Sequence, residues 1–216
     1  MKIENNIENF LELRKEDSRY TSFDYCYNYF HSFKKKKDIS NPYNIEMSCL
    51  QLGMFLASWG MYRGSTKVLQ DFNHKVYENV IKLISTCNHK IWKIDVKDYK
   101  NENTINLFKD FRIEIFKSFE EKFIPTETLV TKIMLGVYGN VPAFDTRFRK
   151  GLKIYGKLNS FSLSKIYDFY YNNRNRKIID SYYRKLKTCS YKTGKHSNFP
   201  YSRAKIIDMI GFELGK

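Results

Sequence analysis

The sequence is poor in cysteine and shows no metal-binding spacing. Its four cysteines, Cys26, Cys49, Cys87 and Cys189, lie far apart and form no CxxC pair. Isolated cysteines of this kind are typical of reduced, buried thiols in a cytosolic protein rather than of a disulfide framework or a metal cluster. The four histidines show no HExxH spacing. We therefore predict neither a metal site nor a cofactor.

The chain also lacks long apolar runs and strong turn signals. No run of eighteen apolar residues is present, which excludes a typical membrane-spanning helix. The first residues, MKIENNIENFLELRKED, are charged and amphipathic, unlike a signal peptide. No Asn-Gly pair occurs, so no β-hairpin is indicated. We expect a cytoplasmic protein with no membrane partner.

Acidic residues are in short supply. The chain has 38 Lys and Arg against 23 Asp and Glu, and its formal net charge is +15. A basic surface of this size favours a polyanionic partner, most simply nucleic acid. A/T-rich codons could account for many of the lysines, but they explain the arginines less well. The arginines cluster at Arg147, Arg149, Arg174, Arg176 and Arg184.

Apolar residues recur at helical spacing along most of the chain, which predicts an all-α fold. We expect eight to ten helices in one globular unit, 1–216, with two packed lobes, 1–120 and 121–216, and a cleft between them. Residues 66–86 read as one helix. Residues 90–99 alternate weakly and suggest a short strand or a connector, and residues 188–200 suggest a loop.

Residues 123–156 are the stretch around which the rest is organised. An apolar helix over 129–137 is followed by a glycine- and proline-containing turn, and Asp145 then directly precedes a basic, periodic segment. Aspartate at a helix start accepts the free backbone N–H groups there, which orients its carboxylate. The alternative is that Asp145 is only an N-cap.

The segment VPAFDTRFRKGL, residues 141–152, resembles the VDTHV-R segment of the helix-hairpin-helix DNA glycosylases. The resemblance implies that Asp145 is the catalytic carboxylate and that 128–139 is the second hairpin helix. The family's glycine-rich hairpin is replaced by IPTETLVTK, and Thr126, Glu127 and Thr128 stand where bifunctional members have their lysine. No four-cysteine cluster follows. The resemblance thus implies a monofunctional glycosylase without an iron–sulfur cluster.

Such an enzyme removes a damaged or modified base from double-stranded DNA after flipping the nucleotide out of the helix. The aromatic, arginine and hydroxyl side chains that we predict to hold the base are Trp59, Arg63, Ser65 and Tyr138. The cations that we predict to bind the DNA phosphates are Lys132, Arg147, Arg149, Lys150 and Lys153. Because the hairpin differs from that of repair enzymes, a role in anti-phage defence is an option.

Two other functions fit the same residues. The first is a helical nucleic-acid-binding module without catalysis, in which Asp145 only caps a helix. The second is a protein-interaction domain whose positive charge reflects codon usage. An isosteric Asp145→Asn change distinguishes the first of these functions from a glycosylase. Asparagine also caps helices well, so the change should abolish turnover in a glycosylase and leave a non-catalytic module unaffected.

Overall fold

The structure is a computed structural model that describes residues 3–61, 68–119 and 121–216. The chain is 69% helical, which confirms the predicted all-α fold. The α-helices are α1 (Ile3–Glu12), α2 (Ser22–Ser32), α3 (Ile45–Leu56), α4 (Val68–Asp71), α5 (Glu78–Thr86), α6 (Glu102–Lys117), α7 (Glu127–Tyr138), α8 (Thr146–Leu152), α9 (Ser160–Tyr171), α10 (Asn173–Lys185) and α11 (Arg203–Leu214). Among the described residues, no helix combines the length and apolar character needed to cross a bilayer.

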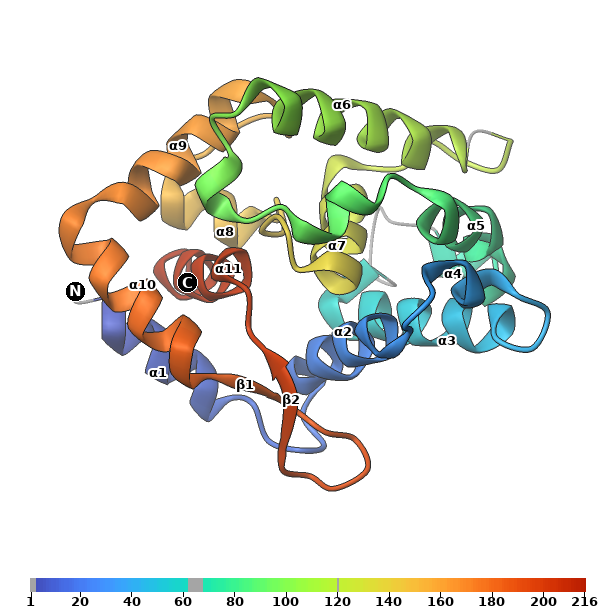
Figure 1. Cartoon of the computed structure of the whole chain (residues 1–216), viewed down its shortest axis with the longest axis horizontal. Helices are drawn as coiled ribbons and strands as arrows, with labels where there is room; N and C mark the ends of the chain where they lie inside the picture. The colour runs from blue at the N-terminus through green and yellow to red at the C-terminus, as the bar shows by residue number, and fades with distance from the viewer. Residues whose placement is uncertain (1–2, 62–67, 120) are drawn as a thin grey trace.

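Short helical turns and one hairpin complete the described structure. The turns are η1 (Arg19–Thr21), η2 (Lys36–Ser40), η3 (Ala57–Met61), η4 (His74–Tyr77), η5 (His89–Lys93) and η6 (Val96–Asp98). The strands β1 (Lys187–Cys189) and β2 (His196–Pro200) pair antiparallel. The hairpin projects from the helices at the bottom of Figure 1.

The helices pack mainly as two groups. In the first group, α2 and α3 pack against α7, and α5 and α6 join them; in the second, α8, α10 and α1 pack around α11, and α9 packs on α10. Helix α1 lies beside α10 and α11 in Figure 1, although it begins the chain. The packing therefore does not follow the lobe boundary that we predicted near residue 121. The first helix belongs with the last ones, and α7 belongs with α2 and α3.

One hydrophobic core joins the two groups. The ring of Phe10 on α1 lies 5.7 Å from that of Phe212 on α11 and 6.2 Å from that of Trp59 at the end of α3. Helix α7 runs through this core and is buried on every side from Leu129 to Tyr138. A helix buried all round carries apolar residues on all faces. This explains why its sequence is apolar on all faces apart from Thr131 and Lys132, which are buried with the rest.

Helices α8 and α11 approach so closely that their backbones nearly touch. A Cβ atom on Gly151 would lie 2.1 Å from the carbonyl oxygen of Gly211, and one on Gly211 would lie 2.5 Å from the ring of Phe148. Two glycines, Gly151 and Gly211, thus face each other where the helices cross. The contact sets the position of α8, and with it the residue that begins α8.

Two sequence predictions about local structure were wrong, and a third left two alternatives of which one is excluded. Residues 66–86 do not form one helix, because η4 separates α4 from α5. Residues 90–99, for which the sequence allowed a short strand or a connector, form a connector with the turns η5 and η6. Residues 188–200 contain most of the β-hairpin rather than a loop. Helix α2 stabilises this hairpin, because Asp24 accepts the N–H of Cys189 and Asn28 donates to the Cys189 carbonyl oxygen. Gly194, with φ at 64°, marks the turn, but the strands on either side depend on residues that are distant in the chain.

We predict that Gly151→Ala lowers the free energy of unfolding by at least about 2 kcal/mol, because the new methyl group would overlap the backbone of α11. Urea unfolding followed by circular dichroism measures this. Gly53→Ala in α3 is the matched control, since its Cβ would meet side chains alone, the Tyr77 ring at 3.3 Å and the His74 Cβ at 3.8 Å, and would gain about 1 kcal/mol of helix propensity. Equal effects of the two changes would contradict the close α8–α11 packing.

Candidate active site

The segment that leads to Asp145 is fixed along its length by two helices. Gly139 ends α7 in the left-handed conformation, with φ at 64°, and a Cβ there would lie 2.7 Å from the Tyr27 ring. The chain then runs back along α7. Thr131 accepts the N–H of Phe144 at 2.9 Å, and Thr128 donates to the carbonyl oxygen of Phe144 at 2.9 Å. The backbone immediately before Asp145 is therefore held in place.

The two carboxylate oxygens of Asp145 have different surroundings. Oδ1 accepts the backbone N–H of Phe148 at 3.0 Å, which confirms the predicted helix cap. Oδ2 faces the ammonium group of Lys132 on α7 at 3.7 Å, an ion-pair distance rather than a hydrogen bond. The Asp145 side chain is 19% exposed. One oxygen thus orients the group, and the carboxylate remains within reach of solvent.

Lys132 lies in the interior beneath Asp145. Its side chain is 6% exposed, and its Nζ donates to the carbonyl oxygen of Trp59 at 2.6 Å. That carbonyl is available because the backbone at Trp59 and Gly60 leaves the helical conformation. Burial lowers the pKa of the Lys132 ammonium, and the charges of Asp145 and Asp208 partly oppose this shift. A buried ammonium does not fit the phosphate contact that we predicted for Lys132.

A second buried ion pair supports the same segment from α11. Lys205 donates to Oδ2 of Asp208 at 2.7 Å, and Oδ1 of Asp208 accepts the N–H of Ala143 at 3.0 Å. The Lys205 ammonium also lies 4.3 Å from the centre of the Trp59 ring. Burial raises the pKa of the Asp208 carboxyl, and Lys205 opposes this shift. Two lysines and two aspartates therefore meet around Trp59 and residues 143–145.

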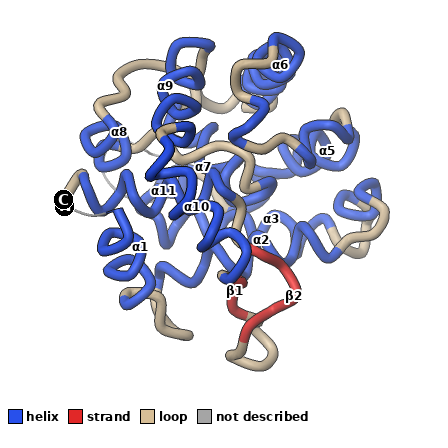
Figure 2. Tube along the Cα trace, turned by 60° about the vertical axis from the view of Figure 1, so that its left-hand side comes forward, coloured by secondary structure: helices blue, strands red, loops and turns tan. Residues whose placement is uncertain are grey.

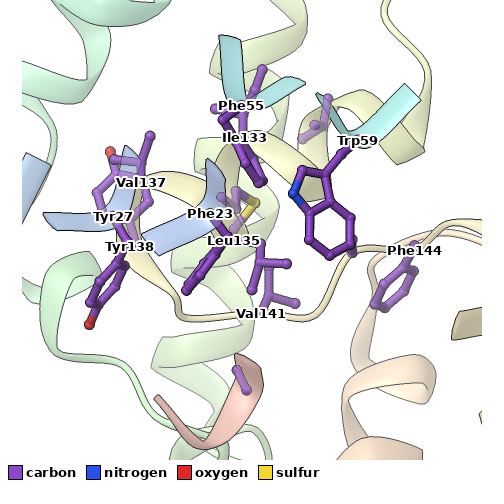
Figure 3. Close-up of a cluster of buried hydrophobic side chains, with 14 of the residues drawn as sticks. Phe23, Tyr27, Phe55, Trp59, Ile133, Leu135, Val137, Tyr138, Val141 and Phe144 are labelled. Carbon is purple, nitrogen blue, oxygen red and sulfur yellow. The ribbon is translucent and has the colours of Figure 1, made fainter. Parts of the chain in front are cut away.

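The two predicted base-holding residues that the structure describes, Trp59 and Tyr138, do not come together. Trp59 is buried and packs against Phe55, whereas Tyr138 lies beside Tyr27 at the opposite end of the cluster in Figure 3. The Tyr138 hydroxyl pairs with the thiol of Cys87, and its ring packs edge-on against core aromatics. Tyr138 is thus a core residue rather than a stacking surface. Arg63 and Ser65 lie outside the residues that the structure describes.

The basic residues of α8 follow Asp145 in chain order. Arg147 and Lys150 are exposed, and the Arg147 guanidinium lies 4.6 Å from the centre of the Phe212 ring. Arg149 is half-buried and its Nε has no partner. Lys153 is exposed, and it ends α8 in the left-handed conformation with φ at 52°. Arg147, Lys150 and Lys153 are thus exposed, as the predicted phosphate contacts require.

The sequence reasoning missed Lys205 and Asp208. The signal was a Lys–Asp pair at i, i+3 inside the otherwise apolar run AKIIDMIGF, where charges have to be paired to be buried. Among the described residues, no group of three or more His, Cys, Asp or Glu side chains is arranged to hold a metal ion.

No family model, curated protein or solved structure matches this chain.

We predict that Asp208→Asn destabilises the fold by about 3–5 kcal/mol, because it leaves the Lys205 charge buried without its partner. The double variant Lys205→Met/Asp208→Asn should recover most of this loss, since it removes both charges and keeps an acceptor for the Ala143 N–H. Urea unfolding at pH 7 compares them. If the double variant is no more stable than Asp208→Asn, the two charges are not coupled as described.

Proposed function

We propose that this chain is a DNA N-glycosylase that excises a damaged or modified base from double-stranded DNA in the cytoplasm, with Asp145 as its catalytic carboxylate. One observation carries the proposal: Asp145 is fixed at the start of α8 by its own cap and by the pinned segment before it, yet it stays partly exposed. The resemblance of residues 141–152 to the helix-hairpin-helix glycosylases agrees with this placement.

Cleavage of an N-glycosidic bond leaves positive charge on the sugar at C1′ in the transition state. A fixed carboxylate near C1′ stabilises this charge and can orient the attacking water. Asp145 is suited to this role because its orientation is set before the substrate arrives, so little reorganisation accompanies the reaction. The Lys132 ammonium beneath it balances the negative charge of the Asp145 carboxylate.

The basic residues that follow Asp145 supply a place for the DNA backbone. Flipping a nucleotide out of the duplex costs a few kcal/mol, and phosphate contacts on either side help to offset this. Arg147, Lys150 and Lys153 are exposed on or at the end of α8, within a few residues of the carboxylate. They would hold the strand while the nucleotide reaches Asp145.

The first test is base release from labelled duplexes that carry damaged bases or phage-type hypermodified cytosines. Alkali converts each resulting abasic site to a strand break, which gels resolve. We expect release by the wild type and a loss of at least about a hundredfold in Asp145→Asn, because the amide cannot stabilise the cationic sugar.

Asp145→Asn should keep the helix cap, since asparagine accepts the Phe148 N–H as well as aspartate does, but it should lower stability because Lys132 loses its charged partner. Thermal unfolding measures this loss and shows whether the variant is folded at the assay temperature. If the protein binds every duplex on a broad panel and releases no base, it is the non-catalytic nucleic-acid-binding module, and Asp145 is only a helix cap. If it prefers no nucleic acid over other polyanions of equal charge, the protein-interaction domain is favoured.

A further inference from the structure

The stretch that follows Asp145 contains no acidic residue. Residues 146–167 contain six cations and no Asp or Glu. The cations are Arg147, Arg149, Lys150, Lys153, Lys157 and Lys165. In the rest of the described chain, many of the lysines and arginines have acidic partners, such as Lys82 with Glu78 and Lys100 with Asp168. An acid-free surface attracts polyanions without internal competition.

Two aromatic rings stand exposed in the same stretch. The Tyr155 side chain is 71% exposed and that of Phe161 is 61% exposed, whereas Leu158, the aliphatic residue between them, is buried. Large exposed rings leave apolar surface in water, which is unfavourable in the free protein. These two rings alternate with the lysines along the chain.

The exposed groups lie at the end of α8, on the loop that follows it and on the first turns of α9, and this segment is held in place. The Lys165 ammonium lies 4.7 Å from the centre of the Phe161 ring and 3.4 Å from the carbonyl oxygen of Lys153, so both ends of the stretch meet. Glu127 accepts the N–H of Leu158 at 2.6 Å and is itself held by Arg112. Helices α8 and α9 meet here at the upper left of Figure 2.

We propose that this surface, formed by Lys153, Tyr155, Lys157, Phe161 and Lys165, binds unpaired nucleotides next to the catalytic site. The bases would stack on Tyr155 and Phe161, and the lysines would contact the phosphates between them. Aromatic rings alternating with cations are the usual means of binding single-stranded nucleic acid without sequence preference. The substrate would then be DNA with unpaired nucleotides beside the target base. The link to excision rests on the function proposed above, but the binding itself does not.

A membrane surface is the other polyanion that rings and lysines can bind, and the structure favours nucleic acid over it. Insertion into a bilayer requires a continuous apolar face. Here Ile154, Leu158 and Leu163 point into the core, and only two separate rings are exposed. The surface also continues directly into α8, whose basic residues begin next to Asp145.

Fluorescence anisotropy tests the proposal with three labelled DNAs: a single strand, a fully paired duplex and a duplex with a three-nucleotide bulge. We expect Tyr155→Ala/Phe161→Ala to weaken binding of the single strand and of the bulged duplex by about thirtyfold, given the usual stacking contribution of each base. Binding of the paired duplex should change by less than about twofold. Tyr43→Ala, at an exposed tyrosine outside this surface, is the matched control and should change nothing.

Unchanged single-strand binding by the double variant overturns the proposal, as does an equal loss for all three DNAs. Binding of wild type to vesicles containing anionic phosphatidylserine, lost in the double variant while DNA binding persists, would assign the surface to a membrane instead. None of these readouts requires base release. A protein that binds as expected but excises nothing overturns the glycosylase alone, and one that excises without the stacking effect overturns this surface alone.

Discussion

The ammonium group of Lys132 lies in the interior between the two groups of helices, where its positive charge has to be compensated. An uncompensated charge in such a place costs several kcal/mol, so its partners are constrained with it. The carbonyl oxygen of Trp59 from the end of α3 and the carboxylate of Asp145 at the start of α8 supply that compensation. The requirement to neutralise one lysine thus ties α3, α7 and α8 together at the point where a carboxylate reaches the surface.

The other parts of the site extend this constraint. Asp208 holds the N–H of Ala143 from α11, and Thr131 holds that of Phe144 from α7, so the residues before Asp145 are fixed from both groups of helices. Gly151 allows α8 to lie directly on α11. A carboxylate positioned by this many independent contacts is preorganised, as electrostatic stabilisation of a transition state requires. The same helix leads into the acid-free surface around Tyr155 and Phe161.

Sequence periodicity predicted the fold class and the amphipathic helices, because those depend on local spacing. It also predicted that Asp145 caps a helix, since a cap is made by neighbours in the chain. It did not predict the pairing of Lys132 with Asp145 or of Asp208 with Ala143, which depends on how helices cross. The same limit explains the hairpin, which is fixed by Asp24 of α2, and Tyr138, whose aromatic ring suits a core and a base pocket equally well.

The most direct test of a cation-stabilising role for Asp145 does not require the base to be known. Two duplexes would be compared, one with a neutral tetrahydrofuran abasic analogue and one with a protonated pyrrolidine that mimics the cationic sugar. Because a catalyst binds its transition state more tightly than its ground state, the wild type should prefer the pyrrolidine duplex by at least about tenfold. Asp145→Asn should lose that preference and keep its affinity for the neutral analogue. Equal affinity of the wild type for both duplexes would contradict the account.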